Sequence, residues 1–110
     1  MAIGHVAPGT VVPYTNTGGV AIAANTVIEF AAMIGITTGI IAPGATGTVA
    51  ISEVWTLPKD DNLVITQGDQ LYWDTVSEEI NKTALNNIPA GKAYNSALLA
   101  GTEIQVILNL

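Results

Sequence analysis

The sequence contains no cysteine, which excludes disulfide bonds within the chain and metal sites built from thiolates. Basic residues are almost as scarce: Lys59, Lys82 and Lys92 stand against nine acidic residues, and the formal net charge is −6. Proteins that bind the phosphate backbone of nucleic acids need clustered cations. We therefore expect no nucleic-acid partner.

Charge of either sign is also rare. Charged residues make up 11% of the chain, against about 25% in an average soluble domain, while hydrophobic residues make up 49%. A chain of 110 residues can bury one core, so residues 1–110 are predicted to form a single domain. A small domain of this composition leaves apolar surface outside its core, and association with other copies or a partner would cover it.

No long hydrophobic run is present. The longest apolar stretch, residues 31–41, is interrupted by Gly35, Thr37, Thr38 and Gly39. It falls short of the roughly 20 apolar residues that a membrane helix needs. Residues 1–9 lack a basic segment followed by an apolar one, as an export signal would require. We expect neither membrane association nor export.

The residues of common catalytic sites are missing as well. The single histidine, His5, cannot form a zinc site without cysteine or further histidine, and it is a poor base for a serine triad so near the terminus. Gly91-Lys92 resembles the end of a phosphate loop, but Asn86 stands where a glycine is required and Ala93 where a hydroxyl is required. The sequence predicts no enzyme, no cofactor and no metal site.

Glycine and proline are plentiful, and they recur at intervals that leave room for short strands rather than long helices. Alternating apolar residues predict a strand over residues 49–57, with Glu53 at a bulge or at the sheet rim. A closing strand is predicted near the C-terminus, with its inward side chains at Ile104, Val106, Leu108 and Leu110. These patterns predict an all-β domain.

Shorter strands fill the rest of the prediction. They span residues 11–14, 20–23, 27–30, 34–38, 63–66, 71–74, 79–83 and 88–94. Residues 25–33 and 96–100 are the two places where a short helical turn is an alternative. Because closure would hide the edges of so many short strands, we expect a small β-barrel or a barrel-like sandwich of antiparallel strands.

The acidic residues of the segment TLPKDDNLVITQGDQLYWD, residues 56–74, raise the question of a hydrolytic site. Asp60 and Asp61 follow Pro58-Lys59, and Asp69 follows Gly68, positions at which aspartate commonly bonds to the backbone of a turn. A glycosidase would instead need two carboxylates facing each other across a cleft, with Asp69 and Asp74 as the candidates. Turn formation is the preferred interpretation.

The aromatic residues Trp55, Tyr72 and Trp73 allow a second interpretation. Aromatic rings on a surface can stack on sugars, which would make the chain a carbohydrate-binding or receptor-binding module displayed on a virion. Aromatic residues in strands more often pack in the core or across strands. Packing is therefore the preferred role.

Two segments of the chain resemble a known family. Val54-Trp55-Thr56-Leu57-Pro58-Lys59, followed by Gln67-Gly68-Asp69-x-Leu71-Tyr72-Trp73-Asp74, is similar to the signature of the DUF2190 family of phage and prophage proteins, many of which are capsid decoration or cement proteins. The signature residues with an expected structural role are Leu57, Pro58, Lys59, Gly68, Asp69, Tyr72, Trp73 and Asp74. Glu53 departs from the pattern, because such proteins commonly have glycine there.

The resemblance implies a β-rich subunit without catalytic activity that binds the outside of a phage head and reinforces the shell. It implies a homotrimer, the major capsid protein as partner, and a location on the capsid exterior after assembly in the host cytoplasm. Residues 1–10 are a candidate for an extended N-terminal arm, and Ile3, Val6, Val11 and Val12 are its candidate contacts with the shell or a neighbouring subunit.

Overall fold

The computed structural model describes residues 10–110, which form nine strands in two antiparallel sheets and contain no helix. The first sheet has the order β1 (Val11–Thr15), β4 (Thr46–Ala50), β3 (Ile34–Thr37), β2 (Val27–Glu29). The second has the order β5 (Val54–Pro58), β9 (Glu103–Leu108), β8 (Ile88–Ala93), β6 (Gln70–Asp74), β7 (Glu79–Asn81).

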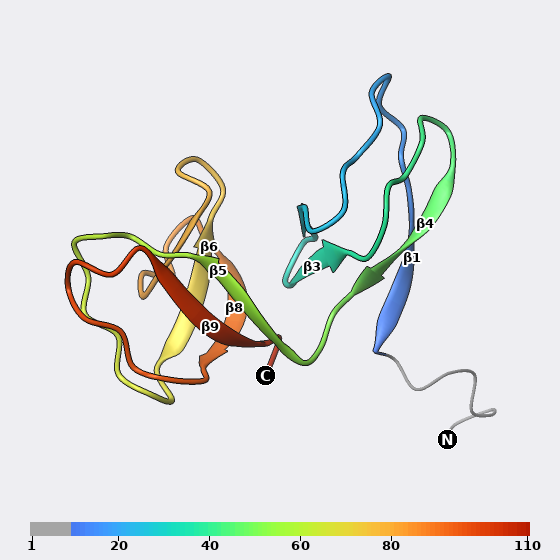
Figure 1. Ribbon diagram of the computed structural model, residues 1–110. Helices are drawn as coiled ribbons and strands as arrows, with labels where there is room; N and C mark the ends of the chain where they lie inside the picture. Colours follow the sequence, from blue (N-terminus) through green and yellow to red (C-terminus); the bar gives the residue numbers. More distant parts are fainter. Residues whose placement is uncertain (1–9) are drawn as a thin grey trace.

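The prediction of a mainly β domain is confirmed, but closure into a barrel is wrong. The two sheets lie side by side in Figure 1, each with its own edge strands. In the second sheet the edge strands β5 and β7 meet only at one parallel bridge, between Lys59 and Ile80. Neither helical alternative forms: residues 25–33 contain β2, a turn and a bend, and residues 96–100 contain a bridge at Ala97 and a turn. Within residues 10–110 no helix is available to cross a membrane.

The predicted strand over residues 49–57 is in fact two strands, and this break explains why the sheets separate. β4 ends at Ala50 in the first sheet and β5 begins at Val54 in the second. Between them Glu53 has a φ of 71°, a left-handed conformation that extended strands do not contain. The turn at this residue redirects the chain from one sheet into the other. Glycine, which is common here in the proteins that the signature segments resemble, would adopt this conformation without steric cost.

One hydrophobic core joins the two sheets. Ile34 and Ile36 of β3 pack in the same buried cluster as residues of the second sheet, among them Leu57, Trp73 and Val106. The prediction for β9 is confirmed at Ile104, Val106 and Leu108, which are buried, and is wrong at Leu110, which is 67% exposed. β9 ends at Leu108, so the alternation of inward side chains does not reach the last residue.

Asn109 fastens the sheets to each other just beyond β9. Its side-chain amide donates to the carbonyl oxygens of Ile34 and Ile51, each at 2.8 Å. Its Oδ1 accepts a hydrogen bond of 3.2 Å from the backbone N–H of Ile34. One side chain after the last strand of the second sheet therefore holds β3 of the first sheet and the segment that connects the sheets.

Candidate functional site

The four acidic residues that suggested a hydrolytic site serve mainly in turns. Asp60 Oδ1 accepts from the backbone N–H of Asn62 at 2.9 Å. Asp69 Oδ2 accepts from the N–H of Thr66 at 2.8 Å and lies 3.4 Å from Lys82 Nζ. The hydrogen bond from Thr66 is the main cause that lowers the pKa of Asp69 from its ordinary value of 3.8.

Asp74 has the same role at the other end of β6. Its Oδ1 accepts hydrogen bonds from the N–H groups of Val76, at 2.9 Å, and Ser77, at 3.2 Å, and these lower its pKa below 3.8. Asp69 directly precedes β6 and Asp74 ends it. Five residues of extended strand separate their Cα atoms by roughly 17 Å, whereas glycosidase carboxylates lie about 5–10 Å apart. The two aspartates are therefore too far apart to act as a hydrolytic pair.

The signature aromatics are largely turned into the protein. Trp73 is only 4% exposed, and its Nε1–H donates to Glu29 Oε2 at 2.7 Å. Trp55 is partly buried and donates from Nε1 to the carbonyl oxygen of Ser52 at 2.9 Å. Tyr72 is partly buried as well. Trp73 thus offers no open ring face on which a sugar could stack.

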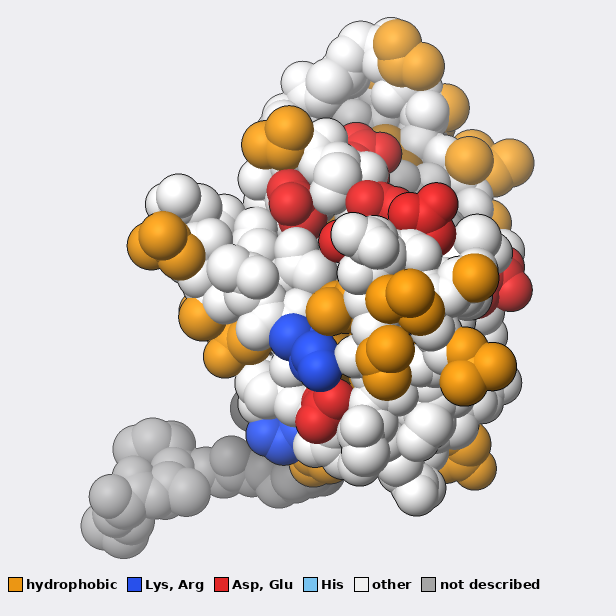
Figure 2. All heavy atoms as spheres, turned by 90° about the vertical axis from the view of Figure 1, so that its left-hand side faces the viewer, with side chains coloured by type: hydrophobic (Ala, Val, Ile, Leu, Met, Phe, Trp, Pro, Cys, Tyr) orange, Lys and Arg blue, Asp and Glu red, His pale blue; other side chains and the backbone are white. Residues whose placement is uncertain are grey.

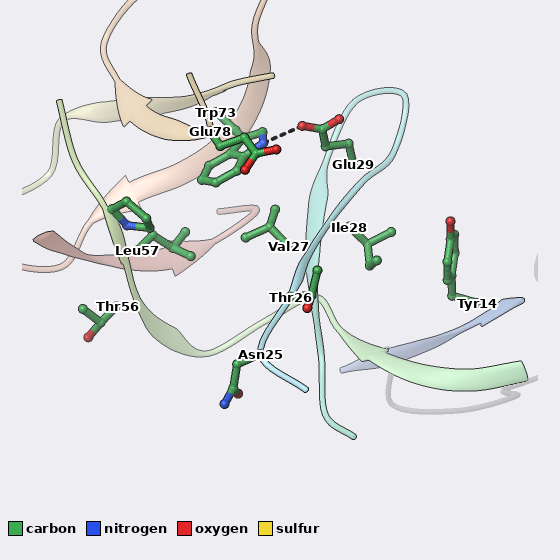
Figure 3. Close-up of a pocket in the computed structure, with 11 residues that line it drawn as sticks. Tyr14, Asn25, Thr26, Val27, Ile28, Glu29, Thr56, Leu57, Trp73 and Glu78 are labelled. Atoms are coloured by element: carbon green, nitrogen blue, oxygen red, sulfur yellow. Dashed lines mark hydrogen bonds between the residues drawn. The ribbon is translucent and has the colours of Figure 1, made fainter. Parts of the chain in front are cut away.

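A cleft of about 580 Å³ opens between the two sheets. Figure 3 shows Trp73 at one end, hydrogen-bonded to Glu29 of β2, with Glu78 beside the indole and Tyr14 at the far side. Only these two carboxylates line it, and nowhere in the described part of the chain do three or more metal-ligating side chains of the His, Cys, Asp and Glu types gather. The cleft has no arrangement typical of a hydrolase or a metal centre.

Lys59 is the signature residue with the least expected environment. It follows Pro58 at the end of β5 and is only 1% exposed. Its Nζ donates to three backbone carbonyl oxygens: Asp60 at 2.7 Å, Gly101 at 3.0 Å and Leu99 at 3.3 Å. These bonds use all three donors of the ammonium group. Sequence reasoning treated Lys59 as an ordinary turn residue, because partners some forty positions away cannot be identified from local spacing.

The loop that Lys59 holds presents apolar side chains to solvent. Residues 63–66 and 96–99 run antiparallel and form a bridge between Ile65 and Ala97, with backbone hydrogen bonds of 3.0 and 2.9 Å. Ile65 is fully buried, and the neighbouring side chains on the opposite side are exposed: Val64 by 49%, Leu98 by 82% and Leu99 by 51%. We call Val64, Leu98 and Leu99 the loop-pair patch. The sequence predicted apolar exposure in general but not its location.

The N-terminal candidates are only partly covered by the structure. Ile3 and Val6 lie outside the described residues. Val11 and Val12 begin β1, an edge strand of the first sheet, where Val11 is 47% exposed and Val12 is partly buried. Of the four side chains proposed for this contact, Val11 is thus the one that the structure places at the surface.

Comparisons with known proteins identify the family. No curated protein and no solved structure matches the chain. A family model described as phage cement protein matches residues 6–108, which include both signature segments and all nine strands. The chain therefore belongs to the phage cement protein family, the same family as the DUF2190 proteins that its signature segments resemble.

Proposed function

We propose that this protein decorates the outer surface of a phage head, binds the major capsid protein and stabilises the assembled shell. Membership of the phage cement protein family carries the proposal, since it associates the chain with the phage capsid. The site chemistry is consistent with it, because the acidic and aromatic residues of the signature mainly support turns and the core. We further propose that the protein forms a homotrimer and is present in the host cytoplasm until heads assemble.

The proposed mechanism is mass action. A protein that binds the assembled shell but not free capsid subunits lowers the free energy of the shell by an amount that grows with its concentration. At a hundred times the dissociation constant this amounts to about 2.7 kcal/mol for each site. Repetition over many sites of a shell allows each contact to be modest.

Heads that lack the protein provide the test. Purified protein added to such heads should co-sediment with them and raise the temperature at which they release DNA, up to a plateau at saturation. A small acidic protein of unrelated fold serves as control for non-specific association. Heads that neither bind the protein nor gain heat resistance would contradict the proposal. Analytical ultracentrifugation of the free protein should give the mass of a trimer.

We also propose that the N-terminal residues contribute to the shell contact, through Ile3, Val6, Val11 and Val12. Deletion of residues 1–10 should abolish co-sedimentation with heads without unfolding the domain, because it removes no residue of the nine strands and only one described backbone hydrogen bond, from the N–H of Ile51 to the carbonyl oxygen of Thr10. Unchanged co-sedimentation of the truncated protein would contradict this part of the proposal.

The alternative function, a glycan-binding module, requires accessible aromatic rings. Trp73 is buried, and Trp55 is partly buried with its N–H bonded to the backbone. We therefore expect tryptophan fluorescence to stay constant during a titration with glycans. A saturable change would favour the alternative.

A further inference from the structure

We propose that the loop-pair patch, Val64, Leu98 and Leu99, is a docking surface for the shell, and that the shell protein meets it with an apolar surface bordered by lysine or arginine. This inference rests on the proposed function and extends it, because it assigns a place on the molecule and a chemistry to the partner. Three observations carry it: the exposure of the patch, the way the chain holds it in place, and the charge around it.

The patch consists of apolar side chains that a single copy leaves about half or more exposed. Leu98 is 82% exposed, and Val64 and Leu99 are about half exposed. They lie on adjacent, bridged segments rather than scattered singly over the surface. In Figure 2, which faces the end of the molecule where these loops project in Figure 1, hydrophobic side chains gather below a band of acidic ones, with lysine side chains to their left. Contiguous exposed apolar groups with a polar border are typical of protein interaction sites.

The chain fixes this patch firmly. The buried amino group of Lys59 bonds to the carbonyl oxygens of Leu99 and Gly101 on one side and of Asp60 on the other. Burial of a lysine is costly unless its hydrogen bonds are satisfied, as they are here. A loop held in one conformation before binding loses less entropy when it binds. Lys59 is thus a positioning residue for the exposed leucines.

The charge around the patch favours the shell over a second copy of this chain as its partner. The patch is bordered by acidic residues: Lys59 joins the backbone of Asp60 to that of Leu99, and Asp61, which is exposed, lies three residues before Val64. A second copy has few lysines with which to meet them. Lys59 is buried and Lys82 pairs with Asp69, which leaves Lys92, whose Nζ bonds to the neutral Gln70 Oε1, and the chain contains no other lysine and no arginine. Two copies joined patch to patch would bring like charges together, which is unfavourable. A copy that met the patch with a different face, as in a trimer, would offer at most Lys82 and Lys92 to this acidic border.

The patch lies away from the N-terminal contact. Figure 1 shows β1 at one end of the molecule and the loops of residues 63–66 and 96–99 at the other, and the molecule spans 40 Å along its longest dimension. Contacts at both ends would allow one cement subunit to span two neighbouring shell subunits. Such a bridge would hold the shell together more effectively than two contacts on one subunit.

The test compares Leu98→Asp with Leu85→Asp in binding to heads that lack the protein. Leu85 is 78% exposed, nearly as much as Leu98, but lies in the turn before β8. We expect Leu98→Asp to weaken binding at least about tenfold, as for a residue central to an interface, and Leu85→Asp to bind as the wild type does. Circular dichroism and thermal unfolding should be the same for both variants, since neither side chain is buried.

A second pair of variants tests the charge of the partner. Asp61→Lys should weaken binding and reduce its dependence on salt, because it removes an attraction to the cationic border of the shell site. Glu53→Lys makes the same change of charge in the link between the sheets and should have little effect. Unchanged binding by Asp61→Lys would contradict the proposal that lysine or arginine borders the shell site.

The outcomes separate this inference from the function on which it rests. If the wild type binds heads and Leu98→Asp binds equally well, the docking surface is wrong and the function stands. If Leu98→Asp instead changes the oligomeric state in ultracentrifugation, the patch joins copies of this chain and the inference is also overturned. If the wild type does not bind heads at all, both fall. Loss of binding with an unchanged oligomeric state supports both.

Discussion

Gly91 occupies a position in β8 that no other residue can fill without moving the backbone. Its φ is 138°, and a Cβ atom built there would lie 2.0 Å from the carbonyl oxygen of Ile107 on the neighbouring strand. Real Cβ atoms do not approach backbone oxygen so closely, so β8 and β9 would have to separate. Gly91 therefore sets how closely these two central strands can pair.

We predict that Gly91→Ala lowers the free energy of unfolding by about 3 kcal/mol or more, in the range of severe backbone strain and overpacking. Gly39→Ala is the matched control, because a Cβ atom at Gly39 meets no atom within 4 Å. Urea denaturation of both variants measures the difference. Equal stability of the two variants would show that β8 and β9 adjust easily.

The turn residues Asp69 and Asp74 make the stability of the fold depend on pH. Backbone N–H groups hold the pKa of Asp69 and of Asp74 below 3.8 in the folded protein. A carboxylate with a lowered folded pKa stabilises the protein above its unfolded pKa, and that stability is lost as the pH falls through the folded value. We therefore expect the melting temperature to fall progressively below about pH 4 through these two groups.

The double variant Asp69→Asn, Asp74→Asn should flatten this part of the curve, because the amide oxygen can still accept the backbone hydrogen bonds but does not titrate in this range. Asp61→Asn is the control: no hydrogen bond to the Asp61 carboxylate occurs within residues 10–110. Melting temperatures measured by calorimetry between about pH 2 and pH 6 would check this. A double variant with the wild-type acid dependence would contradict it.

Local spacing predicts residue roles only when the partner is close in sequence. The turn roles of Asp60 and Asp69 could be predicted, since their backbone partners lie two or three positions away. The roles of Lys59 and Asn109 could not, because all their partners except Asp60 lie 40 or more positions away and become neighbours only after the sheets form. Family resemblance marked Lys59 as important without indicating that it is buried.

At the scale of elements, Asn109 is the clearest link between the two sheets. It makes three hydrogen bonds to Ile34 and Ile51 while its own φ is 55°. Asparagine is among the few residues that tolerate this left-handed conformation. The side chain and the backbone conformation thus both favour asparagine at this position.

Two substitutions of Asn109 separate these contributions. Asn109→Gly keeps the backbone conformation and loses the side-chain bonds, so we expect a loss of about 2–3 kcal/mol in the free energy of unfolding. In Asn109→Ala the alanine must also adopt a left-handed backbone conformation, so this variant should lose about 1 kcal/mol more in the free energy of unfolding. Chemical denaturation measures both. If the glycine variant is as stable as the wild type, the three hydrogen bonds do not stabilise the joint.

Most of the predicted strands form, but residues 20–23 and 63–66 contain only single bridges, at Ile22 and Ile65. The strand predicted over residues 49–57 was wrong in its bounds because the alternation of side chains continues across a bend. Val49 and Trp55 share the same parity, so alternation alone joins them into one strand. The turn at Ser52 and Glu53 leaves that parity intact while moving the chain to another sheet. The interruption of the apolar face at Glu53 was the visible signal, and it was interpreted as a bulge or a sheet rim.

At the scale of the whole molecule, the sequence could not distinguish one closed barrel from two adjoining sheets. Both architectures use short antiparallel strands with alternating burial. The choice depends on which strands pair, and the pairings of β1 with β4 and of β5 with β9 join segments about 35 to 50 residues apart. The two sheets nevertheless share one buried cluster, in which Ile34 and Ile36 of β3 pack with residues of the second sheet.

We predict that the two sheets unfold together. Hydrogen exchange of the amides of β8 and β9 reports the unfolding of the second sheet, and hydrogen exchange of the amides of β3 and β4 reports that of the first. The two probes should give the same free energy of unfolding. Ile34, which is 0% exposed, belongs to the first sheet and packs in the common core. Ile34→Ala should therefore lower the value from both probes by about 2–5 kcal/mol.

Val20→Ala provides the control for this experiment, because Val20 is 79% exposed and its truncation should change neither probe. If Ile34→Ala loosened only the amides of β3 and β4 and left those of β8 and β9 unchanged, the sheets would be independent units. A cement subunit with independent sheets could not transmit load from a contact on β1 to a contact on the loop-pair patch. If this protein is to act as a rigid bridge between two shell subunits, its two sheets must therefore unfold cooperatively.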